Sequence, residues 1–267
     1  MTQGAVLTHS EAGVTTITMN RPERLNTLSA EMMEALQAAL QGAADDPACR
    51  CVLLTGNGRG FSSGADLSAV APAFEKDSPI DFGAPLEPVY HPTLRLMRGM
   101  AKPVVAAVNG VAAGAGCNIA LAADIVLAAR SARFMQAFVR IGLVPDASGS
   151  WVVPRLIGRA RAMQWMMSGE PLDAQTALDW GLIAELHDDE ALPEQAAERA
   201  RQLAAQPTQA LAGIKRLLDA SSGNDFEAQL ALEARTQTEV GYSADTREGI
   251  QAFLEKRPAQ FLSLIHI

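Results

Sequence analysis

The sequence contains few of the side chains that build metal and redox sites. Its 267 residues include three cysteines and four histidines. Cys49 and Cys51 stand one residue apart in a segment that reads as a buried strand, and Cys117 lies far from both, so we expect reduced core thiols rather than disulfides. No histidine keeps ligand spacing with a cysteine, which argues against a metal site. The histidines are His9, His91, His187 and His266.

Positive charge is also scarce. The chain has 22 Lys and Arg against 30 Asp and Glu, a formal net charge of −8. This balance disfavours a broad electrostatic footprint on nucleic acid or an anionic membrane, so we expect neither as a partner. The opening residues, MTQGAVLTHS, lack a basic stretch followed by an apolar one. We therefore expect no secretion signal and a cytoplasmic location.

The sequence lacks an uninterrupted apolar run that would span a membrane. The longest apolar tract, residues 103–129, exceeds the roughly 20 residues that a spanning helix needs. It is interrupted by Asn109, Asn118, Asp124 and several glycines. A strand, a glycine turn, a short helix and a second strand describe this tract better.

Strand and helix patterns alternate from the start of the chain. Residues 5–10 and 13–20 read as a hairpin with Gly13 in the turn. Ser29 is a candidate N-cap for a helix that ends near residue 42 or 45. Residues 50–56 form a buried strand, followed by the glycine-dense turn GNGRGFSSGADL. Tract 103–129 repeats this order, which indicates an α/β fold around one large core.

The later part of the chain is predicted to be helical. Helical periodicity favours helices at about 173–180, 191–205, 208–220, 226–240 and 244–256. Strand signals fade after GLIAEL, so we expect a helical appendage. Earlier, residues 71–92 hold five prolines and little apolar periodicity, which predicts a long loop of the kind that often forms a lid or binding segment.

Two glycine turns carry the first chemical signal. SSGADL and AAGAGCN each lie between a predicted strand and helix, where backbone N–H groups point outward and bind anions or a developing oxyanion. For either turn alone, tight packing is the alternative. GNGRGFSSG lacks the Gly-Lys-Ser/Thr of a P-loop and the G-x-G-x-x-G order of a dinucleotide fold. Both of those phosphate-binding classes are excluded.

A single carboxylate, Asp146, interrupts the segment RIGLVPDASGSW at residues 140–151. Taken locally, Pro-Asp followed by small residues predicts a turn without chemistry. A functional interpretation is that apolar neighbours desolvate Asp146 and raise its pKa towards the range useful for proton transfer. These neighbours are Ile141, Leu143, Val144 and Trp151.

Seven segments, in order, resemble the successive motifs of the enoyl-CoA hydratase/isomerase family, the crotonases. They are NRPERLNTLS, GNGRGFSSGADL, AVNGVAAGAGCNIALAADIVLAA, IGLVPDASGSW, RLIGRARAMQ, GLIAEL and SADTREGIQAFLEKRPAQF. The resemblance implies an α/β spiral of ββα repeats with a C-terminal helical trimerisation region, and trimers that pair into hexamers. We expect the spiral core and acyl-CoA site over residues 1–200 and the C-terminal helical region over 201–261. The tail LSLIHI, residues 262–267, resembles no family ending and is interpreted as non-native.

The resemblance gives the two glycine turns one task. The N–H groups of Ala65 and Ala115 would form an oxyanion hole for the thioester carbonyl of an acyl-CoA, each lowering the barrier to an enolate by roughly 3 kcal/mol. Hydratases of the family use two glutamates, at positions that read Asn118 and Phe138 here. Neither side chain can take a proton. The remaining candidate is Asp146. By the resemblance, it stands where the isomerase branch of the family, notably the epoxyphenylacetyl-CoA isomerases, has the aspartate that acts as acid and base.

We therefore expect an acyl-CoA isomerase in which Asp146 shifts a double bond or opens a ring epoxide of a CoA thioester. The catalytic residues would be Asp146, Ala65 and Ala115. Coenzyme A is part of the substrate, and no further cofactor is expected. Two alternatives stay open: a hydratase in which Asn118 and another group position water, and a non-catalytic crotonase-like scaffold or RNA-binding relative.

Further binding residues follow from the resemblance. The acyl group would meet Asn118, Phe138 and Trp151, and the loop over residues 71–92 would shape the acyl pocket. Structural alternatives exist for some of the CoA contacts, since Asp66 is also a candidate N-cap, Arg24 a solvated charge and Phe253 a core residue. The expected CoA contacts are Arg24, Arg59, Ser63, Asp66, Leu67, Phe253 and Lys256.

Three positions depart from the family pattern. Ser148 stands where a glycine is usual, Ser63 where an alanine is usual, and Ala115 replaces the middle glycine of the second turn. The last change narrows the space beside the thioester.

Overall fold

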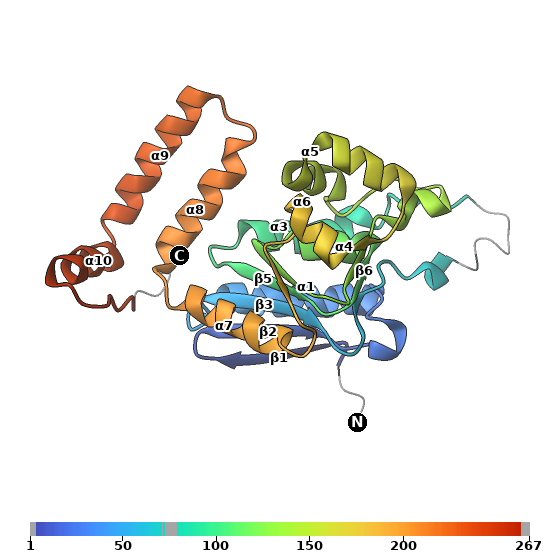
Figure 1. Cartoon of the computed structure of the whole chain (residues 1–267), viewed down its shortest axis with the longest axis horizontal. Coiled ribbons are helices and arrows are strands. Elements are labelled where there is room, and N and C mark those ends of the chain that lie inside the picture. The colour runs from blue at the N-terminus through green and yellow to red at the C-terminus, as the bar shows by residue number, and fades with distance from the viewer. Residues whose placement is uncertain (1–3, 71, 73–78, 263–267) are drawn as a thin grey trace.

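The computed structural model describes residues 4–70, 72 and 79–262, and its strands form two sheets (Figure 1). The larger sheet has the order β1-β2-β3-β5-β7-β10 and the smaller one β4-β6-β8-β9. Neighbours run parallel except β1 with β2 and β8 with β9. The strands are β1 (Val6–Glu11), β2 (Val14–Met19), β3 (Cys51–Gly56), β4 (Gly60–Ser62), β5 (Val104–Val108), β6 (Val111–Ala113), β7 (Ile125–Ala129), β8 (Arg133–Met135), β9 (Leu172–Asp173) and β10 (Glu185–His187).

The helices cover the sheets and continue beyond them at the C-terminal end. Helix α5 contains a break at Gly158, where φ is 77°. Short 3-10 turns lie at Pro22–Arg24, Leu67–Val70 and Ala137–Ile141. The α-helices are α1 (Ala30–Asp45), α3 (His91–Gly99), α4 (Gly114–Leu121), α5 (Gly149–Ser168), α6 (Ala174–Trp180), α7 (Leu192–Ala204), α8 (Thr208–Ser221), α9 (Phe226–Gly241) and α10 (Ala244–Glu255).

Three successive ββα units wind into a spiral. Each gives one strand to the larger sheet and the next strand to the smaller sheet, and then forms helix. The units are β3 and β4 with the 3-10 turn Leu67–Val70, β5 and β6 with α4, and β7 and β8 with the 3-10 turn Ala137–Ile141 and α5. The predicted α/β spiral of ββα repeats is confirmed.

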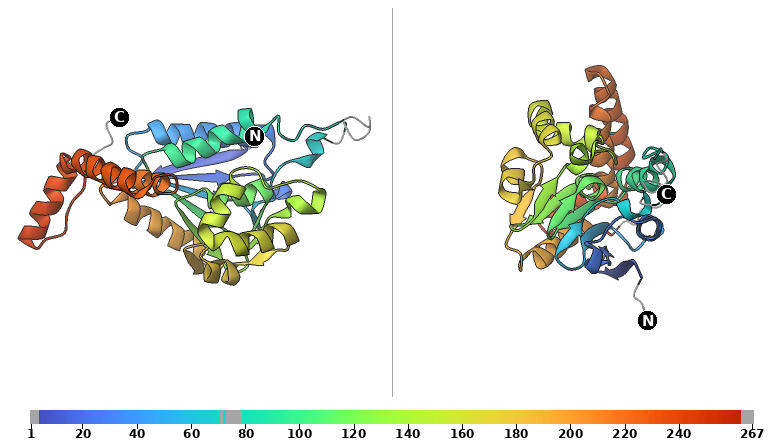
Figure 2. Two further views of the ribbon diagram at one scale, coloured as in Figure 1. Left: turned by 90° about the horizontal axis from the view of Figure 1, so that it is seen from above. Right: turned by 90° about the vertical axis from the view of Figure 1, so that its right-hand side faces the viewer.

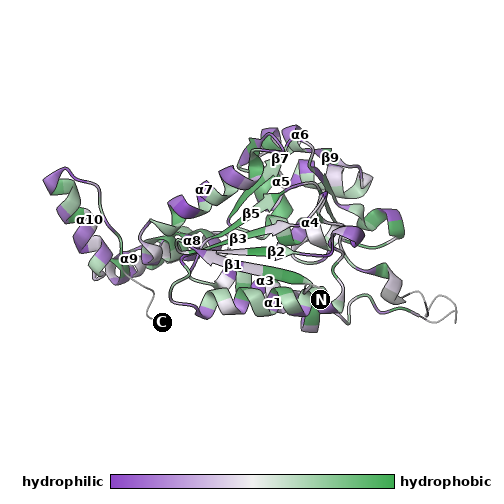
Figure 3. Ribbon diagram, turned by 90° about the horizontal axis from the view of Figure 1, so that it is seen from below, coloured by the Kyte–Doolittle hydropathy of each residue, from purple (hydrophilic) through white to green (hydrophobic). Residues whose placement is uncertain are grey.

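The larger sheet is covered on both faces. Helices α1 and α3 pack on one face and α7 on the other, as both views in Figure 2 and the arrangement in Figure 1 show. The central parallel strands β3 and β5 are apolar apart from Thr55, because both faces of the sheet are covered there. Figure 3 shows these central strands in green, whereas purple polar positions lie on the outer helices.

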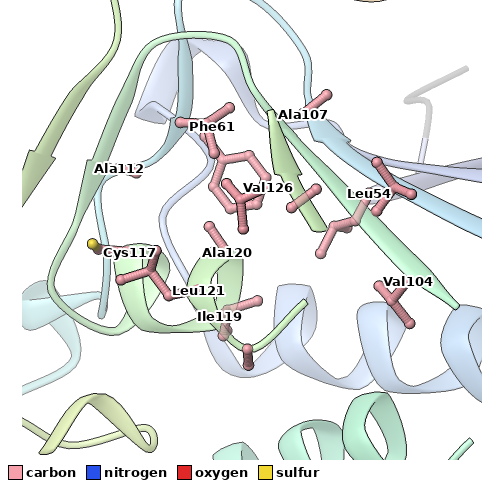
Figure 4. Close-up of a cluster of buried hydrophobic side chains, with 14 of the residues drawn as sticks. Leu54, Phe61, Val104, Ala107, Ala112, Cys117, Ile119, Ala120, Leu121 and Val126 are labelled. Atoms are coloured by element: carbon pink, nitrogen blue, oxygen red, sulfur yellow. The ribbon is translucent and has the colours of Figure 1, made fainter. Parts of the chain in front are cut away.

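Helix α4 packs its small side chains against both sheets (Figure 4). All but the first of its eight residues are buried. Phe61 of β4 and Val126 of β7 lie above this helix in Figure 4, facing Ala120. Because the first turn of α4 consists of Gly114, Ala115 and Gly116, its backbone comes close to β4, where a Cβ on Gly116 would lie 2.5 Å from Ser62 Oγ.

The hairpin, the helix cap and the C-terminal helices agree with the sequence patterns. Ala12 and Gly13 form the hairpin turn with φ of 50° and 78°. Ser29 caps α1, accepting a hydrogen bond from the Met32 amide. The expected boundary between residues 200 and 201 falls within α7, whose Ala196, Ala200 and Ala204 are buried. The division of the chain there and the one at residue 262 stay predictions. Residues 263–267 lie outside the part of the chain that the structure describes.

The long loop predicted over residues 71–92 is shorter than expected. Leu86–Tyr90 form a π-helical turn that continues directly into α3, so the segment is helical from residue 86. The prolines that we interpreted as loop markers include Pro92, which occupies the first turn of α3, where proline fits without losing a hydrogen bond. Residues 71 and 73–78 of this predicted loop lie outside the described part of the chain.

Helices α8, α9 and α10 extend away from the sheets as an arm (Figures 1 and 2). Lys215 of α8 holds this arm to the body through Asp124 Oδ2, at 2.9 Å, and through the carbonyl oxygen of Met97. Arg98 of α3 pairs with Asp219 of α8. Arg50, just before β3, donates to the carbonyl oxygens of Gln206 and Phe261 and so holds both ends of the arm.

The apolar tract 103–129 forms β5, β6, α4 and β7, as predicted, and not one long helix. Among the described residues, no helix has the length and apolar character to cross a membrane. Within the same part of the chain, no group of three or more His, Cys, Asp or Glu side chains is arranged to hold a metal ion. The three cysteines are buried and unpaired.

Candidate active site

A cavity of about 520 Å³ opens where the two glycine turns meet the segment that leads to Asp146. Four parts of the chain form its wall: residues 28–30 with 63–67, residues 82–90, the start of α4, and residues 137–146. The lining residues are Leu28, Ser29, Ala30, Ser63, Gly64, Ala65, Asp66, Leu67, Phe82, Pro85, Leu86, Val89, Tyr90, Gly114, Ala115, Ala137, Phe138, Arg140, Ile141, Leu143 and Asp146.

The first glycine turn, residues 63–65, is fixed by a buried serine. Ser62 Oγ donates to the carbonyl oxygen of Asn26, at 2.8 Å, and accepts from the Gly64 amide, at 3.2 Å. The Asn26 side chain in turn donates to the carbonyl oxygen of Gly60, at 2.9 Å. Gly64 adopts φ of 92°, a conformation that favours glycine. These contacts use the Gly64 amide, and the next residue, Ala65, lines the cavity.

The second glycine turn is the N-terminus of α4. Gly114 has φ of 51° and begins the helix directly after β6. A Cβ on Gly116 would lie 2.5 Å from Ser62 Oγ, so glycine at this position lets the helix approach β4. The same serine therefore shapes the first turn and contacts the helix of the second. As the second residue of the helix, Ala115 has an N–H with no intrahelical acceptor.

The two turns lie in contact, and their free donors face one cavity. A Cβ on Gly64 would lie 2.7 Å from the Ala113 carbonyl oxygen and 3.6 Å from the Ala115 nitrogen. No backbone acceptor within residues 4–70, 72 and 79–262 pairs with the amides of Ala65 or Ala115. Two unpaired N–H groups of this kind can hold an oxygen on which negative charge develops.

Asp146 is one of two aspartates that line this cavity, the other being Asp66. Burial raises the pKa of Asp146 to about 6, while its own main-chain amide and His91 act in the opposite direction. Its Oδ1 is buried and has no hydrogen-bond partner in the described structure. A carboxyl with a pKa near neutrality can both take and return a proton. The predicted rise in pKa is confirmed.

The apolar surroundings of Asp146 differ in part from those that we predicted. Ile141 and Leu143 line its cavity. Val144 is 78% exposed and lies outside the lining. Trp151 lines a separate hollow together with His91 and Arg98. The guanidinium groups of Arg98 and Arg155 lie 4.4 Å and 3.9 Å from the centre of its ring. Trp151 does not line this cavity, and its indole stacks with Arg98 and Arg155 instead; its predicted contact with the acyl group stays a prediction.

Asn118 is placed differently from our prediction. Its side chain is fully buried and outside the cavity lining. Nδ2 donates to the Asp146 carbonyl oxygen at 2.8 Å, and Oδ1 accepts from Gln136 Nε2 at 2.7 Å. Both polar atoms of Asn118 are thus engaged by protein partners, away from the cavity lining. Phe138, by contrast, lines the cavity as predicted, and a Cβ on Gly114 would lie 3.7 Å from its ring.

The expected CoA contacts separate into three groups. Ser63, Asp66 and Leu67 line the cavity. Asp66 Oδ1 also accepts hydrogen bonds from the amide and the hydroxyl of Ser68. Asp66 therefore also makes the kind of contact that we expected of an N-cap. Arg24 and Arg59 are exposed and are not part of the lining.

Phe253 and Lys256 belong to the third group. They are exposed at the outer end of the arm, remote from the cavity of their own chain, and Phe253 is 82% exposed, which excludes its alternative role in the core (Figure 1). Within a single chain the structure does not bring them to the site.

Tyr90 and Arg140 are cavity residues that our sequence interpretation missed. The Tyr90 hydroxyl donates to the Leu28 carbonyl oxygen at 3.3 Å, and burial together with the charges of Asp146 and Asp66 raises the pKa of Tyr90 to about 12. Its phenol therefore stays neutral. Arg140 Nη2 lies 3.0 Å from Glu170 Oε1. Tyr90 belongs to the segment 71–92 that we predicted to shape the acyl pocket, and Arg140 begins the segment RIGLVPDASGSW, but we assigned no role to either residue.

Comparison with known proteins gives consistent matches over nearly the whole chain. Residues 9–263 match the family described as Enoyl-CoA hydratase/isomerase. A 1,2-epoxyphenylacetyl-CoA isomerase from Escherichia coli K12 is 47% identical over 256 residues, covering 96% of this chain and 97% of the relative. A protein named "Probable enoyl-CoA hydratase" from Rhodobacter capsulatus is 48% identical, covering 93% and 94%. The crystal structure of an enoyl-CoA hydratase from Polaromonas sp. JS666 superposes with a TM-score of 0.89 at 34% identity, covering 97% of this chain and all of that one.

Proposed function

Because this chain belongs to the enoyl-CoA hydratase/isomerase family, we propose that it is an acyl-CoA isomerase in which Asp146 is the single acid/base. One observation carries the proposal. A half-buried carboxyl with a pKa near 6 lines the same cavity as the unpaired amides of Ala65 and Ala115. This combination suits removal of a proton next to a thioester carbonyl.

The proposed reaction is a proton transfer that needs no added reagent. The Asp146 carboxylate takes a proton from the carbon alpha or gamma to the thioester, and the C–H electron pair forms a dienolate. The amides of Ala65 and Ala115 hold the oxygen that becomes negative. The protonated Asp146 then returns the proton to the other end of the dienolate, so the double bond moves and the carboxylate is regenerated. No cofactor beyond the CoA of the substrate takes part.

A ring-bearing acyl group suits this cavity. Phe82, Tyr90 and Phe138 line it together with aliphatic side chains. A named relative acts on 1,2-epoxyphenylacetyl-CoA. For such a substrate, the neutral form of Asp146 would donate its proton to the epoxide oxygen as the three-membered ring opens. Ser63, Asp66 and Leu67 would lie beside the CoA, while roles for Arg24, Arg59, Phe253 and Lys256 would require an assembly of several chains, for which we propose a homotrimer or hexamer.

Hydration of an enoyl-CoA is the second candidate, because a relative named as a hydratase is equally similar. Hydration requires a carboxylate that activates water. The two positions that carry glutamate in hydratases hold Phe138 and Asn118, and both Asn118 polar groups are engaged in hydrogen bonds. This arrangement favours isomerisation. A non-catalytic role leaves the buried, unpaired Oδ1 of Asp146 without an explanation.

The two reactions are separated by one optical assay. The enzyme is offered a 3-enoyl-CoA and a 2-enoyl-CoA separately, and the ultraviolet absorbance of the conjugated thioester is followed. An isomerase gives a gain of absorbance with the first substrate; a hydratase gives a loss with the second. Asp146→Asn should lower the isomerisation kcat by about 10²- to 10⁴-fold, the range for removing a general base. Hydration at full rate in this variant would overturn the proposal.

A further inference from the structure

We infer that Gln136 and Asn118 form a positioning relay that fixes the main chain at Asp146 and thereby sets the direction of its carboxyl group. The relay rests on the proposed function, in which this carboxyl moves the proton. Neither Gln136 nor Asn118 lines the cavity, so neither touches the substrate. Their contribution passes through the backbone of Asp146.

The outer step of the relay is the hydrogen bond to the carbonyl oxygen of Asp146. Asn118 Nδ2 donates to this oxygen at 2.8 Å, and the Gly149 amide donates to the same oxygen at 2.8 Å. Two donors from different elements, α4 and the start of α5, thus hold one peptide plane. Because α4 also supplies the Ala115 amide, the same short helix places both an oxyanion donor and the base.

The inner step fixes which way the Asn118 amide points. Gln136, directly after β8, donates from Nε2 to Asn118 Oδ1 at 2.7 Å. With its oxygen committed to Gln136, Asn118 must present its NH₂ group to Asp146. Both side chains are fully buried, where a hydrogen bond that lacks competition from water is directional and costly to lose.

Packing around Asn118 allows little movement. A Cβ on Gly149 would lie 2.3 Å from Asn118 Nδ2, so any side chain at position 149 would displace the amide. The contact explains a glycine within the first turn of α5. It also keeps the Asn118 side chain against the turn that carries Asp146.

The backbone after Asp146 needs such support. Ala147 and Ser148 have φ of 44° and 69°, a left-handed conformation that non-glycine residues adopt at a cost of roughly 1–2 kcal/mol each. A turn in this state persists when surrounding contacts hold it. The two hydrogen bonds to the Asp146 carbonyl oxygen supply that restraint at the residue where the turn begins.

The relay gives a chemical reason for asparagine at position 118. A glutamate or aspartate carboxylate would present only acceptor oxygens to the Asp146 carbonyl oxygen, and the two would repel. An amide can accept from Gln136 and donate to Asp146 at the same time. The loss of a hydratase carboxylate at this position is therefore linked to the gain of a fixed Asp146.

The test replaces Asn118 by leucine, which has a similar shape and no hydrogen-bonding groups. The structure also offers a matched control: Asn20 is buried, donates from Nδ2 to the Gly4 carbonyl oxygen at 3.2 Å, and accepts from Asn57 Nδ2 at 2.8 Å, away from the cavity. Asn118→Leu and Asn20→Leu thus lose the same kinds of contact. Gln136→Met serves as a second variant that leaves Asn118 in place.

We expect Asn118→Leu to lower kcat for 3-enoyl-CoA isomerisation at least about tenfold, because small displacements of a catalytic group have large effects on rate, while KM changes less than about twofold. Gln136→Met should show the same pattern with a smaller loss. A less restrained Asp146 is also less buried, so the acid limb of kcat/KM should move to lower pH in Asn118→Leu. The ionisable residues that line the cavity with Asp146 or act on it, Asp66, Tyr90, Arg140 and His91, are unchanged in all variants. Asn20→Leu should keep the kcat and the pH profile of the wild type.

A second measurement needs no turnover. Amide hydrogen exchange should rise in peptides covering residues 142–152 of Asn118→Leu and Gln136→Met, and should not rise there in Asn20→Leu. Wild-type kcat, pH profile and local exchange in both relay variants would overturn the relay. A wild-type enzyme that isomerises no enoyl-CoA would instead overturn the proposed function, and the exchange data alone would then decide whether the relay holds the turn.

Discussion

The α carbon of Gly64 faces the carbonyl oxygen of Ala113 so closely that a Cβ at position 64 would lie 2.7 Å from that oxygen. Residues from two glycine turns, more than forty positions apart in the chain, are thus packed against each other with no room for a methyl group. The spacing of the two cavity-facing amides, Ala65 and Ala115, depends on this contact.

Gly64→Ala tests that dependence. The variant carries both the clash with Ala113 and a positive φ of 92°, so the first turn must move away from the second. We expect kcat to fall by about 10²- to 10³-fold, the usual effect of losing one oxyanion donor. Steady-state kinetics checks this, with Gly42→Ala as control, because a Cβ at Gly42 meets nothing within 4 Å. Equal rates in the two alanine variants would contradict the assigned role of the turns.

The pH dependence of catalysis should report Asp146. The carboxylate form is the base, so kcat/KM should rise with pH through a midpoint of about 6 and then level off. Below the midpoint Asp146 is protonated and cannot accept the substrate proton. A profile with a midpoint near the ordinary aspartate value would show that Asp146 is not buried in the working enzyme.

The same pKa predicts how Asp146 affects stability. A carboxyl whose pKa is raised in the folded state favours folding when protonated, and that advantage disappears as pH rises through about 6. Asp146→Asn, which removes the buried charge, should therefore increase the Tm at pH values well above 6 and change it little below the pKa of an unfolded aspartate. Thermal unfolding of both proteins across this range measures the difference. A decrease in Tm above pH 6 would contradict the prediction.

Ser148→Gly should stabilise the protein. Ser148 has φ of 69°, and its hydroxyl is buried without a partner in the described structure, so glycine relieves backbone strain and removes no hydrogen bond. We expect the free energy of unfolding to increase by about 1 kcal/mol. Denaturant titration measures it. An unchanged or lower stability would mean that the turn is not strained in solution.

Lys102→Met should destabilise the protein and spare its activity. Lys102 is 3% exposed, and its ammonium donates to the carbonyl oxygens of Ala43, Ala44 and Asp46 at the end of α1. Removing these charged hydrogen bonds should lower the free energy of unfolding by about 2–4 kcal/mol. Denaturant titration with an activity assay separates the two effects, since Lys102 lies outside the cavity.

The features that the sequence predicted are those that local chemistry dictates. Ser29 caps α1 because a serine side chain can bond the next turn wherever a helix starts. The glycine turns were recognisable because a positive φ, as at Gly64 and Gly114, favours glycine. Asp146 could be identified as a buried carboxyl because charge is rare within an apolar segment.

The features that the sequence did not predict depend on the direction of side chains in the folded chain. Trp151 follows Asp146 closely, yet its ring faces Arg98 of another helix. Asn118 was predicted to meet the acyl group, but its oxygen accepts from the buried Gln136 and it lies outside the cavity lining. Strands β8, β9 and β10 have only two or three residues each, too few for an alternating pattern to be recognised. Such details are set by partners that are distant in sequence.

Arg50 binds the Gln206 carbonyl oxygen with one terminal nitrogen and the Phe261 carbonyl oxygen with the other, at 2.7 Å and 2.6 Å. The two places where the chain leaves and rejoins the body are therefore neighbours, spanned by a single planar group. Because the two ends of α8–α10 meet the body at neighbouring points, replacing this segment would leave the course of the spiral backbone unchanged. The outward surface that α9 and α10 present can therefore vary independently of the cavity in the body.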